Sequence, residues 1–475
     1  MQLMRFIRNF LFVLLGLLSF KSTYELLKCK LSNNLVLTYG FNDSYVHYYQ
    51  FDQLILALKN AANDSKIRGV AINYRNGICI NGDSLTSIEE LIDVFDLFKK
   101  NNKFVDLYID GLDSKTAYLA SHVNSTLCES ASSYISGIHV YMPFARDALR
   151  RKGIDITTIA TGEFKNPDPE SRTEMSDEYR EGLEQLIKVL SDIVIDKIKL
   201  IKKVDDIDTI MGLRKNDYIC DLMSFKKGNS FSEWRNKYKK QISINKYVSM
   251  HSNKSSRNKI AIINIFGTIS NESYLGSVEF MNKIEKIANN KDIKAVILRI
   301  DSGGGAVGLS YELYNILKSL SAKKLLVSSI SDTCASGAYL IALSADKIFA
   351  PSVSVVGSIG VYMKHAHIKE PGVNIESINS HNIPDINNRN SPLDDRLKKD
   401  LIKDIRDSMN RFRQLVADRR SFTFEYSRQI SLGQVYAGKD AAKLRLIDKE
   451  GTLLDALNFV QNKQKLSDYE IVWIA

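Results

Sequence analysis

Apolar and polar positions along the chain predict repeated units of amphipathic helix and buried strand. Residues 55–76 and 281–302 each begin with apolar positions at helical spacing, continue through a polar turn and end in a short apolar run. An uninterrupted apolar run of this length is typical of a strand buried on both faces of a parallel sheet. The same patterns predict further elements, namely a strand from about residue 259, a long helix over 393–420, a short helix over 438–445 and a final strand over 470–475. We therefore expect an α/β fold.

The two halves of the chain repeat the same order of motifs. Three further pairs of segments correspond, namely 117–121 with 338–342, 132–142 with 354–363, and 153–159 with 372–378. A repeat on this scale indicates a duplicated architecture. We expect tandem domains of repeated strand–strand–helix (ββα) units over 35–200 and 258–475. A linker region rich in Lys, Asn and Ser is expected between them, over 201–257.

The first 22 residues have the pattern of a membrane-targeting segment. Arg5 and Arg8 precede an apolar run from Phe10 to Leu18, and no small-residue cleavage site follows it. We expect an uncleaved signal anchor or a membrane-dipping helix over 1–22, with its arginines on the cytoplasmic side and the body of the protein exported. A buried N-terminal helix is the alternative interpretation.

Composition narrows the classes of function. The net charge of +10 comes from lysines scattered among asparagines and isoleucines, without a nucleic-acid-binding signature, so no nucleic-acid partner is expected. The five cysteines are widely spaced and include no C-x-x-C pair, which indicates neither a zinc site nor a disulfide framework. His365 and His367 have no carboxylate or cysteine partner at metal spacing and are expected at the surface. No metal or cofactor is predicted.

A glycine-rich loop follows one of the predicted buried strands. The segment IDSGGGAVG, residues 300–308, leaves its backbone N–H groups unshielded by side chains. Such a loop can hold a phosphate or a developing oxyanion. It lacks the Lys-Ser/Thr pair of a P-loop and the G-x-G-x-x-G spacing of a dinucleotide site. By itself the glycine cluster favours a tight strand-to-helix turn over a ligand-binding loop.

Ser336 lies where the predicted strand 324–331 gives way to an apolar helix. A serine at this junction can be a nucleophile beside a free backbone N–H, or it can simply cap the helix. A nucleophilic serine needs a base, and no histidine stands in a triad context. A lysine whose pKa is lowered by burial is the alternative base.

Lys165 is the candidate base, although a lysine is usually a solvated surface residue. It follows the apolar strand at 153–159 and lies in a loop bounded by two prolines. In the repeat alignment, the Ser336 position of the second copy falls on Lys115 of the first. The Lys165 position falls on Pro384 of the second. Each half therefore lacks the group that the other half carries.

These motifs together resemble one family. The segments that carry the resemblance are LRIDSGGGAVG, CASGAYLIALSADKIFAP, VGSIGVYM, GEFKNPDPESRTEMSDEYRE, and FRQLVADRR followed by GQVYAGKDAA. The chain is similar, from about residue 40 to 465, to signal peptide peptidase A (protease IV) in its long, duplicated form. That family is peptidase family S49 of the ClpP/crotonase superfamily. The resemblance implies tandem ClpP/crotonase-like domains.

The resemblance also implies a serine endopeptidase with a Ser/Lys dyad made of Ser336 and Lys165. The oxyanion hole would come from Gly337 and from the glycine loop, at Gly305 with Gly304, and Ser358 would orient the lysine. Further implications are cleaved signal peptides as substrates, a homo-oligomer with a tetramer as one candidate, and a place on the outer face of the bacterial cytoplasmic membrane. Val356 and Asn166 depart from the family pattern beside the lysine.

Two other classes of function are compatible with parts of the pattern. A catalytically impaired oligomeric membrane scaffold would keep the fold without the chemistry. A crotonase-like acyl-CoA enzyme would use the glycine loop as a thioester oxyanion hole, but no acidic pair lies near that loop in the sequence.

Overall fold

The computed structural model confirms a mixed α/β fold. It describes residues 33–40, 50–74, 78, 83–133, 138–165, 168–202, 226–228, 230–251, 256–369, 373, 376, 378 and 385–474. The predicted signal anchor, 1–22, lies outside these residues. None of the described helices combines the length and the apolar character that crossing a membrane requires.

The chain divides into two compact units. The first consists of residues 1–83, 91–135 and 198–255, and the second of residues 84–90, 136–197 and 256–475. Residues 136–197 thus belong with the C-terminal half, although the repeat pattern predicted a domain over 35–200. Lys165 and Ser336 consequently lie in the same unit.

The first unit is built on a six-stranded parallel sheet in the order β6-β4-β3-β2-β1-β7. Its strands are β1 (Leu35–Tyr39), β2 (Ile67–Tyr74), β3 (Phe104–Leu112), β4 (Asn124–Ser133), β6 (Lys226–Gly228) and β7 (Gln241–Ser243). Its helices are α2 (Phe51–Asn63), most of α3 (Leu85–Lys100), α4 (Ser114–Ser121), α8 (Phe231–Asn236) and α9 (Ile244–His251).

The region predicted as a linker, 201–257, is partly structured in this unit. Strands β6 and β7 extend the two edges of the sheet. Trp234 of α8 and Tyr238 are buried against Tyr108 of β3. These large apolar side chains explain why the segment packs on the unit, in spite of its Lys- and Asn-rich composition.

The second unit contains a larger sheet with the path β14-β12-β10-β9-β8-β16, to which β11 and β15 are attached beside β10. Its strands are β8 (Lys259–Ile269), β9 (Ile293–Gly305), β10 (Leu325–Ala335), β11 (Lys347–Ala350), β12 (Val355–Gly357), β14 (Val435–Ala437), β15 (Lys449–Glu450) and β16 (Glu470–Ile474). Its helices include η3 (Tyr274–Gly276), α10 (Val278–Asn289), α11 (Val307–Ser321), α12 (Gly337–Ala342), α14 (Phe424–Ile430), α15 (Gly438–Lys443) and α16 (Leu453–Lys463).

The sequence pattern accounts for the centre of this sheet. Residues Ala295–Ile300 of β9 are buried because β8 and β10 flank the strand and helices cover its faces. β8, β9 and β10 are parallel, so their carboxyl ends meet at one edge. Both the glycine loop, at the end of β9, and Ser336, directly after β10, lie at that edge, where α/β sheets bind ligands.

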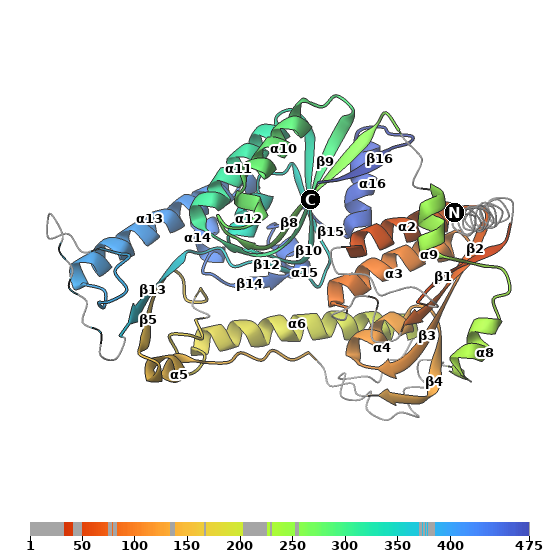
Figure 1. Ribbon diagram of the computed structural model, residues 1–475, viewed down its shortest axis with the longest axis horizontal. Coiled ribbons are helices and arrows are strands. Elements are labelled where there is room, and N and C mark those ends of the chain that lie inside the picture. Colours follow the sequence, from red (N-terminus) through yellow and green to blue (C-terminus); the bar gives the residue numbers. More distant parts are fainter. Residues whose placement is uncertain are drawn as a thin grey trace, which may run out of the picture. The chain divides into compact units, whose positions relative to one another are not determined.

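A separate two-stranded ribbon brings the segment before Lys165 into this unit. β5 (Ile154–Ala160) pairs antiparallel with β13 (Tyr362–Ile368), two strands that are about 200 residues apart in sequence and lie side by side in Figure 1. The remaining helices are α5 (Arg146–Arg151), α6 (Asp177–Lys202) and α13 (Asp395–Arg420). Ile159 and Val361 pack with Leu401 and Ile405 of α13, which fixes the ribbon against that helix.

The surface position predicted for His365 is wrong. The side chain is 5% exposed, because β13 is covered on one face, and its Nε2 lies 3.2 Å from the Ser391 carbonyl oxygen. The prediction failed because the lack of metal-binding partners in the sequence says nothing about burial, which here comes from contacts distant in sequence. Among the described residues, no group of His, Cys, Asp and Glu side chains is arranged to hold a metal ion.

Candidate active site

Ser336 lies in a strained backbone conformation between β10 and α12. Its φ is 56° and its ψ is −123°, a region that is costly for a residue with a Cβ. Its N–H donates to the Gly357 carbonyl at 2.8 Å, which holds the turn in place. The side chain makes no capping hydrogen bond to α12. Ser336 therefore occupies the N-cap position without capping α12 through its side chain, and its half-buried hydroxyl is not committed to the helix.

The glycine loop passes directly beside Ser336. Gly304 has a φ of 96°, and a Cβ at this position would lie 2.7 Å from Gly337 N and 2.8 Å from Ser336 Cβ. No side chain can be accommodated there. The structure thus places the glycine loop directly beside the start of α12.

Two backbone N–H groups converge beside the serine. The N–H of Gly304 donates to Ser302 Oγ at 3.1 Å and is occupied. Ala306, and not Gly305, donates to Ile269 of β8, which directs the Gly305 N–H toward the β10 side of the strand. Gly337 is the first residue of α12, so its N–H has no acceptor within the helix. Gly305 and Gly337 are therefore the donors best placed for an oxyanion.

Lys165 is a buried lysine, contrary to the usual surface position of this residue. Its side chain is 4% exposed and lies in the turn that follows β5. Nζ donates to Ser358 O at 2.7 Å and to Ser358 Oγ at 2.9 Å. Burial lowers the pKa of the Lys165 amine to about 7, because desolvation disfavours its charged form. The amine is therefore available in its neutral form near neutral pH.

The dipeptide Gly357-Ser358 connects the lysine to the serine. Gly357 O accepts from Ser336 N, and Ser358, whose φ is 48°, binds Lys165 through both its carbonyl and its hydroxyl. Within the described part of the chain, no hydrogen bond joins Lys165 Nζ directly to Ser336 Oγ. The structure thus brings together Ser358 and Lys165, two of the residues singled out from the sequence.

Two glycines that the sequence reasoning did not single out shape the lysine's surroundings. A Cβ on Gly360 would lie 2.9 Å from Lys165 Cγ and Cδ, and one on Gly433 would lie 2.4 Å from Lys165 Cβ. The segment 432–434 also forms three backbone hydrogen bonds here, namely Phe164 N to Leu432 O, Gly433 N to Ile359 O and Ser358 N to Gln434 O. In the sequence, the first glycine of GQVYAG, Gly433, is the one signal of this contact. The residue that it packs against, Lys165, lies 268 residues earlier in the chain.

We expect a Gly433→Ala substitution to displace Lys165 and raise the pKa of its amine from about 7 toward the ordinary lysine value. Gly433 has a φ of 88°, and the added methyl group would overlap the lysine backbone, which opens the site to water. The measurement is an NMR titration of isotopically labelled lysine. Gly308→Ala is the matched control, because no atom lies within 4 Å of its added Cβ. An unchanged titration of Lys165 in Gly433→Ala would contradict this account.

The positions that depart from the family pattern are only partly described. Val356 is fully buried in the apolar core of the second unit, where its methyl groups pack among hydrophobic residues. Asn166 and Pro384 lie outside the described residues. In the first unit Lys115 stands near the start of α4, and its Nζ donates to the Asp83 carbonyl oxygen. That position thus carries an ammonium group instead of a hydroxyl.

The fold and this site define a class of protein, namely an α/β protein with a buried lysine near a strained serine and an adjacent glycine loop. The model of peptidase family S49 matches residues 98–211 and 318–467, which is more than half of the chain. The protein belongs to peptidase family S49, a family of serine-type peptidases.

Named relatives agree with this assignment. A protein of Methanocaldococcus jannaschii, provisionally named a protease, is 34% identical over 41% of this chain and 63% of its own. The chloroplastic serine protease SPPA of Arabidopsis thaliana is 26% identical over 86% of this chain and 64% of its own. Protease 4 of Haemophilus influenzae is 24% identical over 88% of this chain and 75% of its own. The chain therefore spans somewhat less than two thirds of the length of the first two relatives.

Proposed function

We propose that this protein is a serine endopeptidase in which Lys165 is the general base and Ser336 is the nucleophile. The observation that carries the proposal is the desolvated Lys165 amine, with a pKa of about 7, held by Ser358 one residue from the Gly357 carbonyl that binds Ser336 N. A neutral amine at physiological pH can accept the hydroxyl proton, which an ordinary lysine cannot.

The proposed reaction is acyl transfer in two steps. Lys165 takes the Ser336 proton, and the Oγ attacks the peptide carbonyl while Gly337 and Gly305 donate to the developing oxyanion. The protonated lysine then gives its proton to the leaving amine, which leaves an acyl ester on Ser336. Lys165 next deprotonates a water molecule, whose attack on the ester releases the acid and restores the serine. Ser358 keeps the amine in place during both steps.

The substrates and setting are also part of the proposal. The family resemblance supports cleaved signal peptides, or other membrane-associated peptides, as substrates. It also supports a homo-oligomer, attached to the bacterial cytoplasmic membrane with the catalytic body on the extracytoplasmic side. The family resemblance likewise supports a fold of two tandem ClpP/crotonase-like domains.

We expect a serine-reactive phosphonate to label Ser336, and the labelling rate to rise with pH through about 7. Below that pH the amine is protonated and cannot activate the hydroxyl, so the rate should fall by about tenfold per pH unit. Above it the rate should reach a plateau. Intact mass and peptide mapping identify the labelled residue at each pH.

The same experiment separates an active peptidase from a catalytically impaired scaffold of the same fold. Ser336→Ala is the control that should take up no label. A scaffold predicts slow labelling of several surface serines without a step near pH 7. Equal labelling of the wild type and of Ser336→Ala would contradict the proposed nucleophile.

A further inference from the structure

One edge of β5 pairs with no other strand in the part of the chain that the structure describes. The ribbon contains only β5 and β13, and its ladder is bracketed by hydrogen bonds from Thr161 N to Val361 O and from Lys369 N to Gly153 O. Hydrogen-bonded pairs alternate along an antiparallel ladder, so Ile159 bonds to β13. Thr158 and Ala160 then direct their backbone N–H and C=O groups to the opposite edge. No described residue satisfies those backbone groups.

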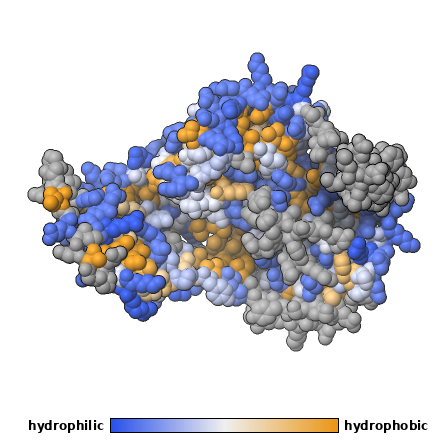
Figure 2. Space-filling model, in the orientation of Figure 1, coloured by the Kyte–Doolittle hydropathy of each residue, from blue (hydrophilic) through white to orange (hydrophobic). Residues whose placement is uncertain are grey.

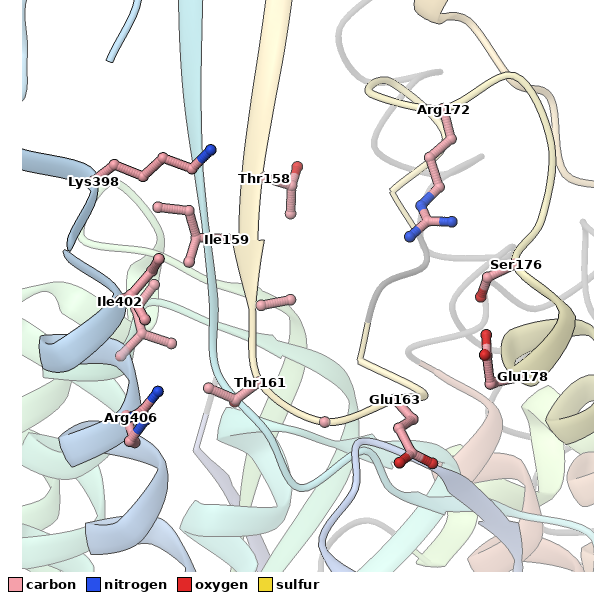
Figure 3. A pocket seen from close by; sticks show the side chains of 13 residues that line it. Thr158, Ile159, Thr161, Glu163, Arg172, Ser176, Glu178, Lys398, Ile402 and Arg406 are labelled. Atoms are coloured by element: carbon pink, nitrogen blue, oxygen red, sulfur yellow. The ribbon is translucent and has the colours of Figure 1, made fainter. Parts of the chain in front are cut away.

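A cavity of about 560 Å³ lies along this edge, a size within the range of ligand clefts. Figure 3 shows Arg172, Ser176 and Glu178 across an opening from β5, whereas Lys398, Ile402 and Arg406 come from α13. Figure 2 shows hydrophobic and hydrophilic residues side by side on the surface around this part of the molecule. The cavity thus combines an open strand edge with a mixed lining.

The charged side chains that line the cavity are available to a ligand. Glu163 lies in the turn that follows β5, Arg172 and Glu178 lie across the opening, and Lys398 and Arg406 lie on α13. None of these five forms an ion pair with another described residue. Between them, Ile402 is 37% exposed and offers apolar surface. This lining suits side chains of mixed character better than a single small charged molecule.

One end of the cavity is lined by Thr161, Gly162 and Glu163, which lie two to four residues before Lys165 in the chain. Thr161, at its end, exchanges two hydrogen bonds with Val361, by Oγ1 to Val361 O at 3.0 Å and by Val361 N to Oγ1 at 3.1 Å. Val361 is three residues after Ser358, and Gly162 accepts from Lys165 N at 3.3 Å. A chain that lies along β5 toward Thr161 therefore runs toward the turn that carries Lys165.

We propose that an extended segment of the peptide substrate binds along the free edge of β5 as an added strand. This inference rests on the proposed peptidase function and names how the substrate is held. Main-chain hydrogen bonds to Thr158 and Ala160 would give affinity with little dependence on sequence, and alternate side chains would meet the lining of the cavity. The free edge supplies the donors and acceptors that such a strand requires.

The test compares two proline variants of the same strand edge. Ala160→Pro removes an outward N–H inside the cavity, and Ile156→Pro removes an equivalent outward N–H that does not line it. Proline is tolerated on an edge where its N–H would not enter the ladder. Both are made in the Ser336→Ala background, so that binding is measured without hydrolysis. The probe is a fluorescein-labelled ten-residue peptide of alternating leucine and serine, followed by fluorescence anisotropy.

We expect Ala160→Pro to weaken peptide binding by roughly tenfold, the effect of one lost hydrogen bond, and Ile156→Pro to leave binding unchanged. N-methylation of single peptide amides should weaken binding at every second position. Equal affinities for the two proline variants, or no alternation along the peptide, would overturn the inference.

Phosphonate labelling of the Ala160→Pro enzyme at Ser336 separates this failure from that of the proposed function. Labelling that persists together with unchanged peptide binding removes only the strand-edge site, whereas a wild-type protein that takes no label removes the peptidase proposal.

Discussion

Replacing Lys165 by methionine is expected to lower kcat for peptide hydrolysis by about 10²–10⁴-fold, the usual contribution of a general base. Methionine has a similar length and is apolar, so it fills the buried site without the amine. The loss should appear in kcat more than in KM, because Nζ is bound to Ser358 and acts on the serine proton in the transition state. Steady-state kinetics with a fluorogenic peptide measures the change.

The control for this result is another lysine of the same unit. Lys188 lies on α6, is 77% exposed and pairs with Asp192, so Lys188→Met should leave kcat within twofold of the wild type. Circular dichroism and thermal unfolding establish that both variants keep their fold. A Lys165→Met enzyme that keeps the wild-type rate would rule out the dyad, whatever the outcome of serine labelling.

Much of the site could be predicted because its parts follow local rules. A buried apolar strand that ends in glycines, and a second strand that ends at Ser336, are both visible as short-range patterns, and parallel pairing brings their carboxyl ends together. The predicted strands at 259 and 470 and the helices near 393–420 and 438–445 are confirmed as β8, β16, α13 and α15. The repeat then drew attention to Lys165.

The rest depends on contacts that no local pattern contains. Gly360 and Gly433 shape the lysine's surroundings from segments 195 and 268 residues away. The sequence does not show which atoms fill the space that a side chain would take at a glycine. The division into units failed to follow the repeat because β5 takes its partner from β13, and not from a strand of its own half. Pairing between distant strands is decided by the whole fold.

The second prediction with a large expected effect concerns the stability that a buried ion pair next to the glycine loop provides. Arg299 of β9 and Glu90, at the end of the segment 84–90, are each 1% exposed and pair at 2.8 Å. Arg299 also donates to Ser329 Oγ, Ile330 O and Ser331 Oγ, and Glu90 accepts from Leu453 N. We expect Glu90→Leu to destabilise the second unit by about 3–5 kcal/mol, because it leaves a guanidinium buried without its counter-charge. Urea unfolding followed by circular dichroism measures the loss.

The double variant Glu90→Leu/Arg299→Met decides between two explanations of that loss. If the cost comes from an uncompensated buried charge, removing both charges should recover most of the stability, since an apolar pair of similar volume avoids the desolvation of both ions. If the cost comes from poor packing around residue 90, the double variant should be as unstable as the single one.

Asp192→Ala is the control, because it breaks the exposed pair with Lys188. It should change stability by less than about 1 kcal/mol, which sets the scale for a solvated ion pair. Because Arg299 directly precedes the glycine-loop segment 300–308, the recovered variant also tests whether the pair supports the site. Phosphonate labelling of Ser336 at the wild-type rate would show that the pair acts on stability alone, and slower labelling would place the loop's geometry under the control of Arg299.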